Sequence, residues 1–183
     1  MEISPTRFKF AEKWREDEHR NRIKNFNCDI RDLNLENESC DICAIVDMTF
    51  TYFFPVDENL PAQVLRKSAE FFKKGGFIII EMPTFNELKR LCESVDFYYE
   101  WDELPETNSF KYALYRTQLD KKNDVLYKES RYVYRHRLGD SIKLESCKVY
   151  SSENLESLVT ANGFSDFRIY GGYDFQCYGG RKI

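Results

Sequence analysis

Runs of apolar residues alternate with amphipathic segments along the first half of the chain. Two of these runs, at 42–48 (ICAIVDM) and 77–83 (FIIIEMP), are continuous, which is typical of strands buried on both faces of a sheet. Residues 57–74 carry apolar residues at helical spacing, and Gly75-Gly76 is expected to end that helix. A strand, a helix and a second strand in this order predict adjacent parallel strands bridged by the helix.

Shorter elements precede the first of these strands. A helix is expected over 5–19, with Pro5 in its first turn and Ser4 as its N-cap. Residues 23–30 predict a short strand, and the three residues before the helix (EIS) resemble the end of another strand. The predicted order in this half is therefore strand end, helix, strand, strand, helix and strand.

The second half changes character, because residues 97–137 are rich in Tyr, Phe, Arg and Lys. Two alternating runs joined by the polar turn 120–124 predict an antiparallel hairpin. A helix is expected over 151–164, capped by Ser151 or Ser152 and ended by Asn162-Gly163. A closing strand and loop are expected to follow it at 165–175.

Composition and charge exclude several classes of protein. The 183 residues are 42% hydrophobic and 32% charged, which is typical of one globular domain. A net charge of −4 argues against a dedicated binder of nucleic acid or of anionic membranes. The chain has neither a membrane-spanning apolar run nor the h-region of a signal peptide, so we expect a cytoplasmic protein.

The six cysteines are expected to be reduced in that compartment. Cys40 and Cys43 have the spacing of a redox or zinc pair. A closed zinc site needs a second such pair, which the sequence lacks, and the residues after Cys43 predict a buried strand rather than a helix start. We therefore interpret this pair as structural and expect no metal site.

Four segments, in order, resemble the class I S-adenosylmethionine-dependent methyltransferases, in particular the small-molecule branch with a hairpin insert before the last helix. They are EIS (2–4), NFNCDIRDLNLENESCDICAIV (25–46), LRKSAEFFKKGGFIIIEMPT (65–84) and YSSENLESLVTANGFSDFRIYGGYDF (150–175). In this order, they are similar to four parts of the family's fold: the end of its second strand, its third and fourth strands, its fifth strand with the preceding helix, and its last helix with the sixth strand. The resemblance implies a Rossmann-like α/β domain with a core over 1–96, an antiparallel insert over 97–140 and a closing helix and strand over 141–183.

The family's glycine-rich G-x-G-x-G loop has no counterpart, because none of the eight glycines lies upstream of Glu2. The resemblance therefore implies an N-terminally incomplete sheet, in which one edge of strand 42–48 is exposed. We consider a truncated gene product or misplaced start codon, a protein completed by a partner chain or by self-association at that edge, and a rearranged fold. We favour the first, and expect this chain alone to bind S-adenosylmethionine weakly or not at all.

The resemblance also assigns cofactor-binding residues. Glu2 takes the place of the acidic residue that binds the ribose hydroxyls, and Asp29 that of the residue that accepts the adenine amino group. The amide of Ile30 is expected to meet a ring nitrogen, and Asp47 and Met48 follow the fourth strand, where open α/β sheets bind ligands. The alternatives are a solvated Glu2, an Asp29 that caps a turn, and a Met48 in the core.

Methyl transfer requires alignment of the acceptor with the methyl group and exclusion of water, and an amine or hydroxyl acceptor can also need a base. Glu81, at the end of strand 77–83, and His136, in the insert, are the candidate catalytic residues. Strand alternation places Tyr132, Tyr134 and His136 on one face. The alternative for His136 is a half-exposed strand with an aromatic face and a charged face.

The resemblance implies a small-molecule acceptor and S-adenosylmethionine as cofactor. Two other functions remain open at this point. The Tyr- and Arg-rich insert could bind single-stranded RNA through stacking and charge, although the acidic composition argues against it. The chain could also be a non-catalytic, methyltransferase-like remnant or subunit.

Overall fold

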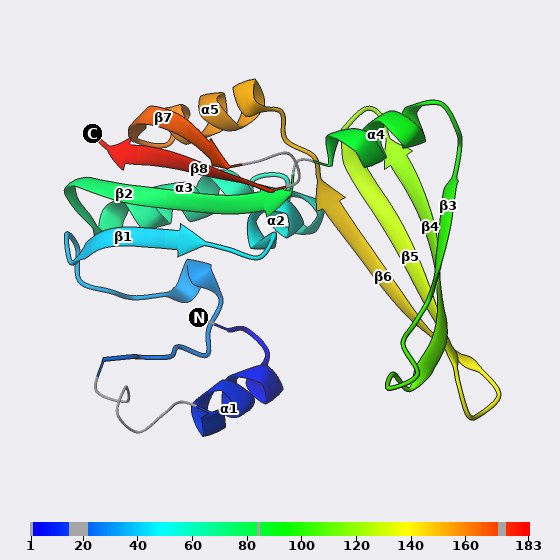
Figure 1. Ribbon diagram of the computed structural model, residues 1–183. Helices are drawn as coiled ribbons and strands as arrows, with labels where there is room; N and C mark the ends of the chain where they lie inside the picture. The colour runs from blue at the N-terminus through cyan, green and yellow to red at the C-terminus, as the bar shows by residue number, and fades with distance from the viewer. Residues whose placement is uncertain (1, 15–21, 84, 172–174) are drawn as a thin grey trace.

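The computed structural model describes residues 2–14, 22–83, 85–171 and 175–183. Within these residues the strands form two four-stranded sheets (Figure 1). The first sheet has the order β1 (Cys40–Ile45), β2 (Phe72–Pro83), β8 (Phe175–Lys182) and β7 (Phe164–Gly171). The second has the order β3 (Tyr98–Glu103), β4 (Phe110–Asp120), β5 (Val125–Tyr134) and β6 (Asp140–Lys148).

The predicted parallel pairing of strands 42–48 and 77–83 is confirmed. β1 and β2 are parallel neighbours, with Ile45 opposite Ile80, and α3 (Leu60–Phe71) lies between them in the chain. β8 pairs antiparallel with both β2 and β7, so the sheet is mixed. The sequence did not predict β8, because only one closing strand was expected after α5 (Ser152–Ala161).

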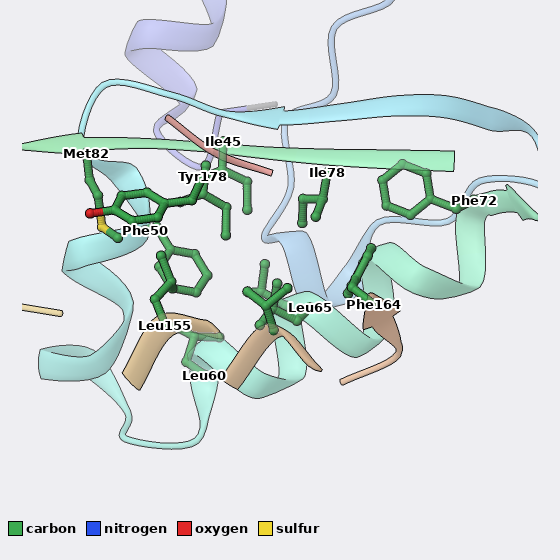
Figure 2. Close-up of a cluster of buried hydrophobic side chains, with 13 residues drawn as sticks. Ile45, Phe50, Leu60, Leu65, Phe72, Ile78, Met82, Leu155, Phe164 and Tyr178 are labelled. Atoms are coloured by element: carbon green, nitrogen blue, oxygen red, sulfur yellow. The ribbon is translucent and has the colours of Figure 1, made fainter. Parts of the chain in front are cut away.

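One face of the first sheet packs against α3 and α5 to form the main core. Figure 2 shows Ile45 and Ile78 of the sheet pointing toward Leu65 of α3 and Leu155 of α5. The fully buried side chains of this cluster include Phe50, Val64, Leu65, Phe72, Leu155 and Phe164. Each such side chain contributes roughly 1.5–3 kcal/mol by leaving water, so this layer is the main source of stability.

The prediction that strand 42–48 is buried on both faces is wrong. Ile45 is buried against the core, whereas Ile42 and Val46 are 63% and 50% exposed. The helices that contact this part of the sheet cover one face, and β1 is the edge strand. The strand also ends at Ile45, before Asp47 and Met48, because both of these residues have positive φ.

The N-terminal region differs from the prediction in one element. α1 (Pro5–Trp14) is confirmed, Ser4 caps it through the Arg7 amide at 3.4 Å, and residues 15–19 of the predicted helix lie outside the described residues. The predicted strand at 23–30 is not formed, and a short 3-10 helix, η2 (Ile30–Asp32), follows this extended segment. The Glu2 amide donates to the Phe26 carbonyl at 3.0 Å, but no ladder of such bonds extends the pairing.

The expected glycine stop after α3 is also wrong. α3 ends at Phe71 and the chain enters β2 at once, so Gly75 and Gly76 lie within the strand. Gly75 has a φ of 77°, and the register between β1 and β2 shifts at this point. The glycines therefore accommodate an irregularity in the strand rather than a helix end.

The predicted hairpin is confirmed as β4 and β5, but it is the centre of a larger sheet. β3 pairs with β4 and β6 pairs with β5, and neither was predicted. The sheet continues to Lys148, past the predicted end of the insert at 140. α4 (Asn86–Glu93) follows β2 and packs near β4, and a second apolar cluster forms there around Cys92, Leu126 and Cys147.

Two short elements connect β1 to α3, namely the 3-10 helix η3 (Thr49–Tyr52) and α2 (Phe53–Val56). They lie between the two sheets, since both contact β6. In the part of the chain that the structure describes, no helix is long and apolar enough to cross a bilayer.

Candidate functional site

The site begins where β1 ends. Asp47 and Met48 have φ of 55° and 61°, so two successive non-glycine residues are left-handed at this turn. The Asp47 amide donates to the Glu81 Oε2 at 3.2 Å, which ties the turn to the end of the neighbouring strand β2. Backbone outliers of this kind cost of order 1–3 kcal/mol and concentrate at functional sites.

A cavity of about 400 Å³, here the N-terminal cavity, opens beside this turn. Four of the predicted cofactor residues, Glu2, Asp29, Ile30 and Asp47, line it together. The remainder of the lining comes from Ile3, Arg7, Cys28, Thr49, Tyr52, Phe53 and Leu60. The fold therefore gathers residues that are far apart in the sequence at the carboxyl end of β1.

Glu2 is held beside the segment that was predicted as a strand. Its backbone oxygen accepts from the Asn27 side chain at 2.7 Å, and its Oε1 accepts from the Ser4 amide at 2.8 Å. No described residue donates a hydrogen bond to Oε2. This carboxylate is thus fixed in position while one of its oxygens remains available to a ligand.

Asp29 forms the turn contact that was the alternative to a ligand contact. Its Oδ1 accepts from the Arg31 amide and Nε at 2.9 and 3.0 Å, and its Oδ2 accepts from the same guanidinium at 2.8 Å. The hydrogen bonds from Arg31 lower the pKa of the Asp29 carboxyl. A carboxylate has about four lone-pair sites, so Asp29 can cap η2 and still accept from a ligand.

A second cavity of about 630 Å³, here the inter-sheet cavity, lies between the first sheet and the second. Arg7, Asp47 and Tyr52 line both cavities, and Met48 lines this one. The other lining residues are Phe85, Leu88, Thr117, Leu126, Lys128, Lys143, Glu145 and Cys147. The two cavities therefore meet at the turn that follows β1.

Glu145 is the centre of the polar contacts in the inter-sheet cavity. It accepts from the Tyr52 hydroxyl at 3.4 Å and pairs with the Lys143 ammonium at 2.8 Å. Burial raises the pKa of Tyr52 to about 12, and the Glu145 charge adds to the effect. Tyr52 consequently stays a hydrogen-bond donor at neutral pH.

Thr117 presents a buried hydroxyl to the same cavity. The residue is 1% exposed, and its Oγ1 has no hydrogen-bond partner among the described residues. Leaving such a group unpaired costs about 1–3 kcal/mol, and nearly all buried hydroxyls in folded proteins are paired. A ligand with a polar atom at this position would satisfy it.

The two predicted catalytic residues are not brought together. Glu81 lies near the end of β2, where its carboxylate accepts from the Asp47 amide, whereas His136 lies in the turn between β5 and β6. His136 lines a different cavity with Glu106, Lys111 and Arg135. Figure 1 shows this turn at the end of the second sheet that points away from the first. The expected alternation fails there because β5 ends at Tyr134.

Sequence reasoning missed Tyr52, Thr117 and Glu145. Thr117 and Glu145 share a face because each pairs in register with Lys128, from the two sides of β5. That register depends on β6, a strand the sequence did not predict. Counting alternate positions outward from the predicted hairpin turn could have assigned Thr117 to this face. No pattern in the sequence indicated Glu145.

The cysteine pair faces the core rather than either cavity. All six cysteines are free thiols, and Cys40 and Cys43 pack against the main cluster. Burial raises the pKa of Cys43, which is the opposite of the shift that activates a redox thiol. Among the described residues, no three His, Cys, Asp or Glu side chains are placed to hold a metal.

No protein-family model and no curated protein sequence matches the chain. Solved structures do match. A S-adenosylmethionine-dependent methyltransferase from Clostridium acetobutylicum has a TM-score of 0.70 at 13% identity, over 98% of this chain and 72% of its own. The sugar N-methyltransferase KedS8 from Streptoalloteichus has 0.65 at 14%, over 98% and 68%.

A third match is CalS10, an amino pentose methyltransferase from Micromonospora echinaspora that was solved with S-adenosylmethionine bound. Its TM-score is 0.62 at 14% identity, over 85% of this chain and 63% of its own length. This chain thus spans between 63% and 72% of these three proteins. At such identities the likeness is one of fold, and it agrees with the order of the sequence signatures. The chain therefore has the Rossmann-like fold of the class I S-adenosylmethionine-dependent methyltransferases.

Proposed function

We propose that this protein takes part in methyl transfer from S-adenosylmethionine to a small polar acceptor. The observation that carries the proposal is the meeting of two cavities at Asp47 and Tyr52, at the carboxyl end of β1. One cavity gathers the residues that the family resemblance assigns to adenosine. The other has mainly apolar walls that also carry hydroxyl and charged side chains, and it is large enough for a sugar- or amine-sized molecule.

The N-terminal cavity fits the adenosine part of the cofactor. Glu2, with one oxygen available, would hold the ribose hydroxyls, and Asp29 would accept from the adenine amino group. The Ile30 amide, in the first turn of η2, would meet the ring. The bound cofactor would supply a methyl group on a sulfonium, whose sulfur leaves as a neutral thioether when the methyl group passes to the acceptor.

The two cavities contribute less to binding the methionine part of the cofactor than to binding the adenosine part. None of the glycines in the described residues lines either cavity, so the close backbone approach of a glycine-rich loop is missing from these walls. We therefore infer that the isolated 183-residue chain binds S-adenosylmethionine weakly. Its activity would then be low or absent without further structure at this wall.

The inter-sheet cavity would hold the acceptor. Thr117 would hydrogen-bond a polar atom of the acceptor and so fix its orientation. Glu145, kept close to Tyr52 and Lys143, could accept a proton from an acceptor amine or hydroxyl. Glu81 would act indirectly by holding the Asp47 turn, and we assign no step to His136, because it lines a different cavity.

The neighbours of known chemistry support an amine acceptor. KedS8 is a sugar N-methyltransferase and CalS10 an amino pentose methyltransferase, and both have this fold. A non-catalytic subunit with the same two cavities is the second candidate, because the chain covers less than three quarters of each of these proteins. Cofactor binding with no transfer to any acceptor would favour the subunit.

An NMR titration tests the proposal, because it detects millimolar binding and locates it. Amide shifts of the 15N-labelled chain would be followed while S-adenosylhomocysteine is added, and adenosine alone would serve as a second ligand. We expect changes at Asp29, Ile30 and Asp47 and none at His136. No change, or changes confined to the turn between β5 and β6, would contradict the assignment. Mass spectrometry of an aminosugar panel would then test transfer.

A further inference from the structure

Lys128 of β5 lines the inter-sheet cavity and forms no ion pair with any described residue, although it is half-buried. Its ammonium lies 4.1 Å from the centroid of the Tyr115 ring, so its neighbour is an aromatic face rather than a carboxylate. Lys143 lines the same cavity but differs, because it pairs with Glu145 at 2.8 Å. Lys128 is therefore a positive charge in the cavity wall that an anionic group of a ligand could neutralise.

The unpaired Thr117 hydroxyl stands beside this ammonium. The strand register places Thr117 of β4 directly opposite Lys128 of β5. Residues opposite each other in an antiparallel pair have Cβ atoms about 4.5–5.5 Å apart and project to the same face. Thr117 is 1% exposed, and among the described residues its Oγ1 has no hydrogen-bond partner. A buried hydroxyl donor next to an ammonium favours an anionic oxygen in the space that both line.

A carboxylate lies on the other side of Lys128. Glu145 of β6 also stands opposite Lys128, so Thr117, Lys128 and Glu145 form one row across three strands, here the polar row. The Lys143 ammonium and the Tyr52 hydroxyl both contact Oε1 of Glu145, at 2.8 and 3.4 Å, and no described residue donates to its Oε2. The polar row thus presents an anion site and a cation site on neighbouring strands, which lie about 4.8 Å apart.

The charges of the cavity match a molecule that carries one carboxylate and one ammonium. The charged lining residues are three cations and two carboxylates, namely Arg7, Lys128, Lys143, Asp47 and Glu145. The excess of one cation suits a single negative charge, whereas a phosphate monoester carries up to about two. An α-amino acid has its carboxylate and its ammonium on one carbon atom, so the two groups can face neighbouring positions of the polar row.

The other walls of the cavity suit the side chain of such a molecule. Met48, Phe85, Leu88 and Leu126 supply apolar surface. We propose that the acceptor is an α-amino acid, whose carboxylate is bound by Lys128 and Thr117 and whose amino group faces Glu145. This inference rests on the proposed function, because it names the class of molecule that the inter-sheet cavity holds. A neutral aminosugar would have no group for Lys128.

Matched pairs of ligands test the carboxylate. Glycine, L-leucine and L-phenylalanine would each be compared with the corresponding amide, which keeps the amino group and replaces the carboxylate with a neutral group. Amide shifts of the 15N-labelled 183-residue chain would be followed at pH 7, with and without S-adenosylhomocysteine. We expect at least one amino acid to bind about tenfold more tightly than its amide, with shift changes along the polar row.

Lys128→Gln removes the charge and keeps most of the length of the side chain. It is expected to lower the affinity for the preferred amino acid about tenfold and to leave the affinity for its amide unchanged. Thr117→Val is expected to lower the same affinity severalfold. Lys111→Gln is the matched control, because Lys111 also lies on the second sheet over a tyrosine ring, at 5.0 Å from its centroid, but lines a different cavity. This control is expected to bind like the wild type, and amide shifts outside the cavity check that each variant is folded.

Three results would overturn the proposal: equal affinity for every amino acid and its amide, no binding of any of these ligands, or a preference that survives Lys128→Gln. A Lys128→Gln variant that loses S-adenosylhomocysteine and retains adenosine would also overturn it, by assigning Lys128 to the carboxylate of the cofactor. The proposed function is read separately, from the shifts of Asp29 and Ile30 with S-adenosylhomocysteine. Carboxylate selectivity without those shifts would support the amino acid site and contradict the cofactor assignment.

Discussion

Ile30 serves the site and the core through different groups. Its side chain packs against the main cluster, while its amide lies in the first turn of η2, at the wall of the N-terminal cavity. A change of side chain and a loss of the amide can therefore be separated. Asp29, just before it, has ψ of 149°, which is the backbone region that a following proline requires.

Ile30→Pro is expected to remove the amide while η2 is retained, because proline is tolerated in the first turn of a helix. Ile30→Ala keeps the amide and loses the same packing, so it is the matched control. We expect the proline variant to weaken adenosine binding by about 0.5–1.5 kcal/mol relative to the alanine variant, the range for one hydrogen bond. Equal binding by the two variants would show that the amide does not contact the ligand.

Thr117→Val tests whether the buried Thr117 hydroxyl lacks a hydrogen-bond partner in the ligand-free chain. Thr117→Val replaces an unpaired buried hydroxyl with a methyl group, and is expected to stabilise the ligand-free chain by about 1 kcal/mol. Thr51→Val is the control, because Thr51 is equally buried but donates to the Met48 carbonyl at 2.8 Å. The free energy of unfolding of Thr51→Val is expected to fall by about 1 kcal/mol. Urea unfolding measures both, and destabilisation by Thr117→Val would mean that its hydroxyl is paired.

Cys147 is expected to make the free energy of unfolding fall at alkaline pH. Burial raises the pKa of this thiol to about 12, whereas the unfolded thiol has a pKa near 8.5. The neutral thiol is favoured in the fold, so its contribution is complete below about pH 8.5 and is lost as pH rises toward 12. Between these values the free energy of unfolding should fall by up to about 1.4 kcal/mol per pH unit from this group.

Cys147→Ala is expected to reduce that slope while it lowers stability at neutral pH. Cys177→Ala, which changes a half-buried thiol in the first sheet, is the control. Urea unfolding at pH 7, 9 and 10 would compare the three proteins, each at constant ionic strength. A Cys147→Ala slope equal to that of the parent would show that another group titrates instead, and Cys43, whose pKa is also raised by burial, is the next candidate.

At the scale of elements, β1 shows what an apolar run predicts and what it does not. Its continuous apolar pattern correctly predicted a strand paired with β2. The pattern did not reveal that one face of the strand carries no cover, because apolarity records a preference for burial and not the presence of a partner. Ile45 and Ile42 are both isoleucines of β1, yet Ile45 is buried and Ile42 is exposed.

Ile45→Ala is accordingly expected to cost about 2–4 kcal/mol, as in other large-to-small core changes. Ile42→Ala, on the open face, should stay within about 0.5 kcal/mol. Thermal unfolding of both variants, with the protein concentration held fixed, makes the comparison. A loss at Ile42 as large as that at Ile45 would show that its face is covered in solution.

The strands that sequence reasoning missed have a physical reason. β3 carries aromatic and acidic residues on both faces, and in β6 apolar and charged residues alternate only over 142–145, so neither strand was identified in the way that β4 and β5 were. β8 contains Gly179 and Gly180, and glycine ordinarily weakens a strand. In this fold the Phe77 ring lies 2.5 Å from the point a Gly179 Cβ would occupy, so the glycine is needed for packing between strands.

The candidate site could be predicted from the sequence only in part. The family resemblance assigned Glu2, Asp29, Ile30 and Asp47, and the fold brings these four residues to the wall of one cavity. Thr117 and Glu145 were not found, since they belong to the register of the second sheet. His136 was misgrouped because a strand pattern was extended two residues past the end of β5.

At the scale of the whole molecule, the walls of the N-terminal cavity make affinity for the two parts of the cofactor unequal. We expect the 183-residue chain to bind adenosine and S-adenosylmethionine with similar, weak affinity, because the described cavity walls contact mainly the adenosine part. Calorimetry and the NMR titration would compare the two ligands. Micromolar binding of S-adenosylmethionine with much weaker binding of adenosine would show that the methionine part is held strongly by this chain.

Arg7, Asp47 and Tyr52 line both cavities, so the two compartments share three side chains. A ligand that orders these side chains from one compartment reduces the conformational entropy that a ligand in the other must still lose. The coupling is reciprocal by thermodynamic necessity, so whatever factor the nucleoside exerts on acceptor affinity, the acceptor exerts on nucleoside affinity. The affinity of a weak cofactor site in this chain would accordingly rise in the presence of its proper acceptor. Acceptors can therefore be screened by measuring how each one changes the affinity for the nucleoside.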